Sequence, residues 1–426
     1  MGARRPDPVS IAMPLRSNFL ALAGLAGLVL LAACGSSDRA SGGGGAQSGQ
    51  IGHVFLIVLE NKSYDLSFGA DTAAPYLGKQ LPTQGVLLQN YYGVGHNSLD
   101  NYIAMISGQA PNLSTQADCP TLSDFATSAL VLKGQIVGAG CIYPSNIPSL
   151  ADELSSAGIS WKGYMQDMGN DPSRYDPALA VSDTRPQGPR TCGHGTIGSV
   201  DQTQSASATD QYATRHDPFM YFHNIIDDQE YCDEHVVNLD DAFVDDLGKV
   251  DTTPAFSFIT PNLCDDGHDA NCANGDVGGL TGIDRFLQQW VPVILGSAAF
   301  KKDGLLIITY DESTNFTDDS TACCGEKGTV SQLLLQGGIT GPGGGRVGAV
   351  LISPFIKPGT VSTQAYNHYS LLRSIADIFG VAYLGHAADG DTSGGAACDH
   401  DQQPCSFGSD VYTRELPTFP ARPASS

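Results

Sequence analysis

The chain has 426 residues, of which 41% are hydrophobic and 16% are charged, so it can build a large core and is not disordered over most of its length. Its net charge of −23 argues against a nucleic-acid partner and against membrane binding through a basic patch. The length allows up to three domains, or one large α/β domain with insertions.

The N-terminal residues have the pattern of an export signal. Several arginines precede an apolar run at 19–33, which is too short to span a hydrocarbon core of about 30 Å comfortably. The ending Leu-Ala-Ala-Cys at 31–34 resembles the bacterial lipobox, in which the cysteine is acylated. We expect a lipoprotein signal peptide at 1–33 and a lipid on Cys34, which would anchor an exported chain in the cell envelope. The alternative is a plain secretory signal.

The rest of the chain divides by composition. Residues 34–50 are rich in Gly and Ser and are expected to form a flexible tether. Residues 51–415 form one folded domain in this interpretation, and 416–426 form a tail. Within the domain, the stretch around 171–217 is polar, punctuated by Gly and Pro, and without periodicity. It is expected to leave the sheet and to form part of a rim or lid.

Apolar runs and helical spacings alternate along this domain. The strand-like runs lie at 53–59, 255–259, 304–310 and 347–353. Helical spacing appears at 147–157, 282–295 and 369–379. This alternation is typical of a mostly parallel sheet with helices on both faces. The predicted fold class is therefore α/β, a three-layer αβα sandwich around a mostly parallel central sheet.

The cysteine count suggests disulfides. Apart from Cys34 the chain has ten cysteines, and an even number in an exported protein favours disulfide bonds over a reduced set. Cys264 with Cys272 and Cys398 with Cys405 are candidate pairs, although spacing does not decide connectivity. The adjacent pair at 323–324 does not suit two independent bridges, and its state stays open.

Acidic residues follow two of the expected strands. Glu60 and Asn61 come after the first strand, and Asp311 and Glu312 come after the strand at 304–310. Ligands of open α/β sheets collect at the carboxyl ends of the strands. Oxygen donors of this kind suit a divalent cation, although acidic residues and Asn also begin ordinary turns.

A third feature is a helix that is expected to start at Ser98. Apolar residues at 99, 102, 103 and 106 have helical spacing, and Gly108 is expected to end the helix. Ser98 therefore lies at or near the helix N-terminus, where free backbone N–H groups favour an anion. The simpler interpretation is a capping residue. Beside a cation, however, the same hydroxyl can be a nucleophile.

These pieces resemble the phosphoesterase family, which contains acid phosphatases and phosphocholine-type phospholipases C and belongs to the alkaline-phosphatase-like superfamily. Residues 60–65 are similar to the family signature Glu-Asn-Arg-Ser-Phe-Asp, and 96–102 to His-x-Ser-x-x-Asn-Tyr. Residues 261–268 are similar to Pro-Asn-x-Cys-Asn-Asp-x-His. Matching segments at 309–312, 346–354 and 368–373 complete a set in family order.

The resemblance implies roles for individual residues. The expected metal-site residues are Glu60, Asn61, Asp311 and Glu312, and the ion is Ca, Mg, Mn or Zn. Ser98 would be the nucleophile and would become a phosphoserine. His268 would be a transition-state contact or general acid. The expected substrate-binding residues are Asn101, Asp266 and His368. The other histidines in this part of the chain, His96, His194, His216 and His223, are interpreted as structural or surface residues.

One departure from the family pattern favours the acid-phosphatase branch over the phospholipase branch. The phospholipase branch usually has an Asp-His shortly after its strand-end acidic pair, whereas this chain has no histidine between Glu312 and His368. The predicted function is therefore a metal-dependent acid phosphatase that hydrolyses phosphate monoesters through a phosphoserine. The alternatives are a phospholipase C-like phosphodiesterase and a non-catalytic lipoprotein that only holds an ion. The expected partners are a phosphate-ester substrate and, through the N-terminal lipid only, a membrane.

Overall fold

The structure is a computed structural model that describes residues 51–126, 131–132, 134–178, 190–326, 343–390 and 398–412. The described residues belong to one unit, Ala46–Ser426. The predicted signal peptide, Cys34 with its expected lipid, the expected tether and the tail at 416–426 lie outside the described residues.

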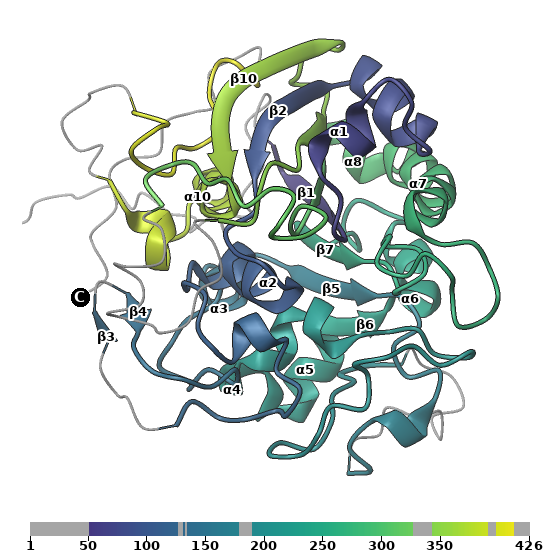
Figure 1. The fold of residues 1–426 in the computed structure, drawn as a ribbon, viewed down its shortest axis with the longest axis vertical. Coiled ribbons are helices and arrows are strands. Elements are labelled where there is room, and N and C mark those ends of the chain that lie inside the picture. Colours follow the sequence, from purple (N-terminus) through teal and green to yellow (C-terminus); the bar gives the residue numbers. More distant parts are fainter. Residues whose placement is uncertain are drawn as a thin grey trace, which may run out of the picture. The chain divides into compact units, whose positions relative to one another are not determined.

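The centre of the fold is an eight-stranded sheet with the strand order β10-β2-β9-β8-β1-β7-β5-β6 (Figure 1). Within it, β9 runs antiparallel to both of its neighbours, β2 and β8. The other pairings are parallel. The sheet is therefore mostly parallel, as expected. The strands are β1 His53–Leu59, β2 Val86–Tyr92, β5 Trp161–Met165, β6 Val236–Asn238, β7 Phe256–Thr260, β8 Gly304–Tyr310, β9 Ala349–Ile352 and β10 Thr360–Asn367.

Helices pack in two groups that contact different neighbours. Helices α2, α3 and α10 contact one another, whereas α7 contacts α8, and Figure 1 shows α7 and α8 away from α2 and α10. Every residue of β1, β7, β8 and β9 is buried, which requires cover on both faces of the central strands. Within the described residues the α-helices are α1 Tyr64–Phe68, α2 Ser98–Ser107, α3 Leu150–Ser156, α4 His223–Ile226, α5 Gln229–His235, α6 Leu239–Asp246, α7 Gly279–Gly296, α8 Ala298–Asp303 and α10 His368–Phe379. A separate two-stranded sheet pairs β3 Val131–Leu132 with β4 Gln135–Ile136.

The apolar runs of the sequence became strands at nearly the expected residues. The runs at 53–59 and 304–310 are β1 and β8 with the same bounds, and those at 255–259 and 347–353 are β7 and β9 within two residues or fewer at each end. The three helical spacings correspond to α3, α7 and α10. The antiparallel direction of β9 is not visible in its residues, because a buried strand is apolar in either direction.

The predicted helix after residue 97 is α2. Asn97 is its N-cap residue, so Ser98 is the first helical residue, and Gly108 ends the helix in the left-handed conformation with a φ of 67°. A Cβ at Gly108 would lie 2.2 Å from the backbone oxygen of Leu384. Glycine is therefore required here both by conformation and by space. All ten residues of α2 are buried, and Ser98 at its N-terminus contacts Glu60, the residue that follows β1.

All ten cysteines of the described residues form disulfides. The candidate pairs Cys264–Cys272 and Cys398–Cys405 are bonded. The adjacent cysteines, whose state the sequence left open, are bonded to each other. The remaining bridges are Cys119–Cys141 and Cys192–Cys232. Among the described helices, none combines the length and the apolar composition that a membrane span needs.

Candidate active site

Strand register brings the two acidic strand ends together. Leu59 of β1 is paired with Tyr310 of β8, so the next residues, Glu60 and Asp311, begin neighbouring loops at the same edge of the sheet. The backbone N–H of Asn61 donates to Asp311 Oδ1 at 3.0 Å. Asn61 adopts a positive φ of 55°, a conformation that asparagine tolerates better than most residues. The chain therefore turns sharply here and keeps the Asn61 amide directed at the neighbouring strand end.

The hydroxyl of Ser98 lies at this acidic edge. Ser98 Oγ donates to Glu60 Oε2 at 2.7 Å, and Tyr102, one turn later on α2, donates to Glu60 Oε1 at 2.7 Å. Ser98 is 2% exposed and Glu60 is fully buried. The N-terminus of α2, with its positive dipole end, therefore faces the strand-end carboxylates. The Leu99 N–H, which was expected to be free for an anion, donates to Asp118 Oδ1 at 3.0 Å. An anion and a cation can be bound side by side in this arrangement.

The carboxylates raise one another's proton affinity. Burial raises the pKa of Glu60 well above its ordinary value, and the nearby charges of Asp311 and Asp266 raise it further. Burial raises the pKa of Asp311 to about 6, against hydrogen bonds that include one from the Asn61 amide. Burial and the charge of Asp311 raise the pKa of Glu312 as well. A positive charge bound among these groups would favour their charged forms.

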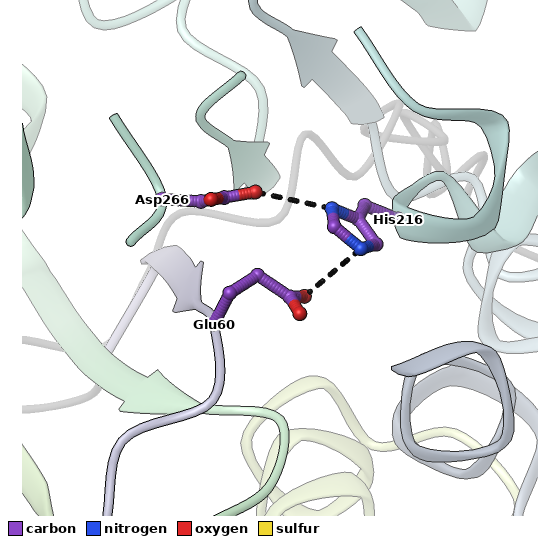
Figure 2. Close-up of side chains that lie close together, drawn as sticks. All are labelled: Glu60, His216 and Asp266. Atoms are coloured by element: carbon purple, nitrogen blue, oxygen red, sulfur yellow. Dashed lines mark hydrogen bonds and ion pairs between the residues drawn. The ribbon is translucent and has the colours of Figure 1, made fainter. Parts of the chain in front are cut away.

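His216 joins this group from a distant part of the sequence. Figure 2 shows it between Asp266 and Glu60. Its Nδ1 lies 3.1 Å from Asp266 Oδ2, and its Nε2 lies 3.4 Å from Glu60 Oε1. The three side chains form a cluster with the spacing of a metal site and are all buried. His216 is therefore not a surface residue, because its side chain is buried within this cluster.

The donor atoms fit a divalent cation. Within the described residues, three buried polar atoms in this group have no hydrogen-bond partner: Asn61 Oδ1, Asp311 Oδ2 and His216 Nε2. If His216 Nδ1 carries the proton that Asp266 accepts, the lone pair on Nε2 faces a carboxylate oxygen. Buried atoms of this kind without partners are unfavourable. Carboxylate, amide and imidazole donors would all be satisfied by a cation.

Glu312 and His96 form a buried pair at the outer side of the group. His96 Nδ1 contacts Glu312 Oε2, and His96 Nε2 lies 3.0 Å from the backbone oxygen of Asp319. The backbone N–H of Asn97 donates to Glu312 Oε1 at 3.0 Å. His96 therefore ties the residues before α2 to the loop after β8. Its contacts are those of a positioning residue.

The structure gives Asn101 partners other than the expected phosphoryl oxygens. Asn101 Oδ1 accepts from the backbone N–H groups of Val94 and Gly95, at 2.8 and 3.2 Å. Its Nδ2 donates to the backbone oxygens of Gly95 and Asn97 at 3.1 and 3.0 Å. The side chain is fully buried. It holds the loop that precedes α2 and so positions Ser98.

His368 has a similar fixing role in the structure. It is the first residue of α10 and is fully buried. Tyr91 Oη lies 3.0 Å from its Nδ1, and its Nε2 lies 2.5 Å from the backbone oxygen of Asp311. Burial lowers the pKa of His368 to about 4, which favours a neutral ring. Both ring nitrogens therefore have protein partners, and the contact with Asp311 supports the acidic strand end.

Asp266 and His268 lie on the loop after β7. The backbone oxygen of Asp266 accepts from the Glu60 N–H at 2.8 Å, and Asp266 Oδ1 accepts from the His268 N–H at 2.7 Å. His268 Nε2 lies 3.2 Å from Nη2 of Arg215, and its Nδ1 lies 2.7 Å from Asp269 Oδ1. The loop therefore places a carboxylate inside the cluster and a half-exposed imidazole at its edge.

Sequence reasoning gave neither Arg215 nor His216 a role in the site. They lie on the 3-10 turn Thr214–His216, at the end of the polar stretch around 171–217. This turn contacts α2, so a segment expected to form a rim or lid also reaches the inner part of the site. The dipeptide Arg-His was the only feature of the sequence here that could have indicated a site residue, but it belongs to none of the segments that resemble the family.

A polar cavity of about 640 Å³ lies elsewhere, lined by residues that include Tyr92, Cys323, Cys398 and His400. None of the residues of the acidic group lines it. The candidate active site is therefore the acidic group and not this cavity, because the acidic group brings the Ser98 hydroxyl together with buried carboxylates.

Comparison with known proteins identifies the family to which the chain belongs. A model described as the Phosphoesterase family matches residues 71–382, a range that includes Ser98, His216, Asp266 and Asp311. A protein of Kluyveromyces lactis named probable acid phosphatase is 25% identical over 339 residues, which cover 80% of this chain and 60% of that protein. The chain thus spans about three fifths of the length of this fungal relative.

Two further similarities were found. A protein of Mycobacterium tuberculosis named phosphatidylinositol-3-phosphatase is 23% identical over 337 residues, which cover 79% of this chain and 80% of that protein. A solved structure from Vibrio parahaemolyticus, described as a protein in the alkaline phosphatase superfamily, matches 84% of this chain and 72% of that chain. Its sequence identity is 12% and its TM-score is 0.44.

Proposed function

Because the chain belongs to the phosphoesterase family, we propose that it is a metal-dependent hydrolase of phosphate monoesters, of the acid phosphatase type. One observation carries this proposal: the Ser98 hydroxyl lies at a helix N-terminus and 2.7 Å from a buried strand-end carboxylate. The names of the fungal relatives support the reaction type. Since those relatives are longer than this chain, the substrate remains part of the proposal.

Ser98 is the nucleophile in this proposal. Its oxygen attacks the phosphorus atom, an oxygen–phosphorus bond forms, and the bond to the ester oxygen breaks. The leaving alkoxide takes a proton from water and departs as the alcohol. Water then attacks the phosphoserine and releases inorganic phosphate. The positive dipole end of α2 favours the negative charge that develops on the phosphoryl oxygens. The Ser98 proton is directed at Glu60, which is placed to accept it.

We assign Glu60, Asn61, Asp311 and Glu312 as the residues that would hold the divalent cation, with His216 and Asp266 at its inner side. When bound, such a cation would supply a positive charge that lowers the pKa of a nearby hydroxyl and neutralises an anionic substrate. Asn101, His96 and His368 act by positioning. Asn101 donates to the backbone oxygen of Asn97, beside Ser98, and His368 contacts the backbone oxygen of Asp311. His96 contacts the carboxylate of Glu312 and the backbone oxygen of Asp319.

We also propose that the chain is exported and anchored through a lipid on Cys34. The five disulfides support an oxidising compartment. The two separate groups of helices and the fully buried central strands support the three-layer arrangement as the fold of the catalytic domain. Mass spectrometry of the mature N-terminus tests the anchor, and an unmodified N-terminus other than Cys34 would contradict it.

The test of the proposed function is Ser98→Ala. We expect turnover of p-nitrophenyl phosphate to fall at least about 10³-fold, because the nucleophile is removed, while folding and bound metal are retained. Ser107→Ala is the matched control, since Ser107 is a buried serine of the same helix that donates to the Ile103 carbonyl. Acid-quenched wild-type protein should carry a phosphoryl group on the peptide that contains Ser98. Turnover retained by Ser98→Ala would exclude this mechanism.

The same assay separates the alternatives. Wild-type protein is given the monoester, bis(p-nitrophenyl) phosphate and phosphatidylcholine. Preference for the monoester supports the phosphatase, and preference for either diester supports the phospholipase C-like alternative. Metal binding without hydrolysis of any of the three substrates would support the alternative of a non-catalytic lipoprotein that only holds an ion.

A further inference from the structure

The loop after β1 and the loop after β8 are joined a second time, beyond the acidic strand ends. Nearest the strands, the Asn61 N–H donates to Asp311 Oδ1. Farther along, Ser63 of the first loop contacts Thr314 of the second. The four residues that we assign to the cation all lie between the strand ends and this second contact. The loops that carry them are therefore held by the paired strands at one end and by Ser63 and Thr314 at the other.

Ser63 and Thr314 exchange hydrogen bonds in both directions. The Ser63 N–H donates to Thr314 Oγ1 at 3.2 Å, and the Thr314 N–H donates to Ser63 Oγ at 3.2 Å. The two hydroxyl oxygens lie 3.0 Å apart, and either hydroxyl can donate to the other. Each hydroxyl accepts from a backbone N–H of the other loop, so the loss of either one breaks two of these three hydrogen bonds.

This contact restores the register of the two strands. Leu59 of β1 is paired with Tyr310 of β8, and Ser63 and Thr314 keep the same separation of 251 residues. The loops leave this register at the cation site, where Asn61 contacts Asp311 across 250 residues. The backbone between the last strand pair and Ser63 is therefore fixed at both ends, although it turns irregularly in between.

The hydroxyl of Ser63 does not act as a helix cap. Ser63 is the N-cap residue of α1, but within the described residues its side chain makes no capping hydrogen bond. A serine at this position usually accepts from an N–H of the first helical turn. Here the hydroxyl contacts Thr314 instead. The contact between the two loops therefore accounts for the hydroxyl, and stabilisation of the short helix does not.

The donor atoms that these loops carry depend on the backbone for their positions. Among the described residues, Asn61 Oδ1 and Asp311 Oδ2 are buried and have no hydrogen-bond partner. No other side chain therefore fixes the place of these two oxygens. Hard divalent cations hold oxygen ligands within a narrow range, about 2.0 to 2.6 Å. A shift of one loop against the other would move the two oxygens apart and weaken their joint contact with one ion.

We propose that Ser63 and Thr314 are positioning residues of the cation site, which hold the two loops at the spacing at which Asn61 and Asp311 bind one ion. This inference rests on the cation site of the proposed function and adds two residues that act through the ligands. Side chains that orient metal ligands typically contribute about tenfold to 100-fold to metal affinity. Both residues are only partly buried, so their substitution leaves the apolar core intact.

The experiment measures cation affinity in Ser63→Ala, Thr314→Val and the double variant. Calorimetric titration of the metal-free protein with Mg²⁺, Ca²⁺, Mn²⁺ and Zn²⁺ identifies the ion that wild type binds most tightly, and that ion is used for every variant. We expect each single substitution to weaken binding about tenfold or more. The double variant should be weaker than either single variant by less than about threefold, because residues in contact do not act additively.

Two variants of the same loop are the controls. Thr314→Ser keeps the hydroxyl, so we expect its affinity to lie within about threefold of wild type. Thr317→Val removes an exposed hydroxyl that contacts Asn315 of the same loop, and it should bind the ion as wild type does. The stoichiometry of binding reports the folded fraction, since unfolded molecules lower the number of sites and a misplaced ligand lowers the affinity of each site.

The outcomes separate this proposal from the proposed function. Wild-type affinity in both single variants, a loss in Thr317→Val as large as in Thr314→Val, or a loss in Thr314→Ser as large as in Thr314→Val would overturn it. If wild type binds the ion but hydrolyses no ester, the proposed function fails and the titrations still decide the role of Ser63 and Thr314. If wild type binds none of the four ions, both fail. If the double variant does not fold, the single variants and Thr314→Ser carry the comparison.

Discussion

Two regions of this protein differ in how their buried carboxylates are balanced by positive charge. Asp210, fully buried, lies 2.8 Å from Nη1 of Arg174 and accepts hydrogen bonds from Tyr175 Oη and the Tyr212 N–H. In the candidate active site, by contrast, no Lys or Arg of the described residues forms an ion pair with Glu60 or Asp311.

The difference separates a structural network from a binding site. Around Asp210 the protein supplies its own positive charge and donors, so the group is stable as it stands. Around Glu60 the protein gathers negative charge and leaves Asn61 Oδ1 and Asp311 Oδ2 without partners. A site of the second kind is stabilised by what it binds. Its residues should therefore affect activity more than stability, and the reverse should hold around Asp210.

The largest expected effect is that of Asp311→Asn on activity. We expect kcat/KM for a phosphate monoester to fall about 10³-fold, or about 4 kcal/mol, because a charged cation ligand becomes neutral. The free energy of unfolding of the metal-free protein should stay the same or increase, since one of several like charges is removed. Chemical denaturation and steady-state kinetics measure the two quantities. Asp318→Asn, on the exposed part of the same loop, is the control.

The converse change is Arg174→Leu. It leaves Asp210 buried without its partner, so we expect the free energy of unfolding to fall by about 3 kcal/mol. Turnover per folded molecule should stay near the wild-type value. Urea denaturation with activity corrected for the folded fraction tests this. A loss of activity without a loss of stability would mean that the two groups do not differ as described.

The third prediction concerns pH and cation binding. Burial raises the pKa of Asp311 to about 6, so below that pH a proton occupies the carboxylate and competes with the cation. We expect the affinity for a divalent cation to fall about tenfold or more between pH 7 and pH 5. Calorimetric titration of metal-free protein with Mg²⁺, Ca²⁺, Mn²⁺ and Zn²⁺ at both values measures it. Affinity independent of pH would place the cation away from Asp311.

In the metal-free protein, stability depends on pH in the opposite direction to cation affinity: it decreases as the pH rises. An acid whose pKa is higher in the folded state than in the unfolded state binds its proton more tightly when folded. Its contribution to stability is therefore present at low pH and lost as the pH rises through about 6. Urea denaturation with and without metal, at pH 5 and pH 7, distinguishes the two effects.

The smallest expected effect is that of Arg190→Gln. The ion pair of Arg190 with Asp241 spans 2.7 Å, but both side chains are partly exposed. Solvent screens such pairs, so we expect a change of less than about 1 kcal/mol in the free energy of unfolding and none in activity. A larger change would show that solvent exposure does not explain the difference in stabilisation between this pair and the Arg174–Asp210 pair.

The sequence by itself determined the central strands and the acidic edge of the sheet. Buried parallel strands are continuous apolar runs, so β1 and β8 were visible with their bounds. The residues that follow them, Glu60 and Asp311, had to lie at one edge because parallel strands end there together. The spacing of apolar residues also located α2, and with it Ser98.

Tertiary structure alone decided which polar groups face the site and which are held by the protein. Asn101 and His368 have the residue types of substrate ligands. In the structure Asn101 bonds to the backbone around it, and His368 contacts the Tyr91 hydroxyl and the backbone oxygen of Asp311. Arg215 and His216 lie on a segment without periodicity, whose path is set by long-range packing against α2 rather than by local preference. Hydrogen-bond partners that are far apart along the chain depend on the folded path, which no local pattern of residues encodes.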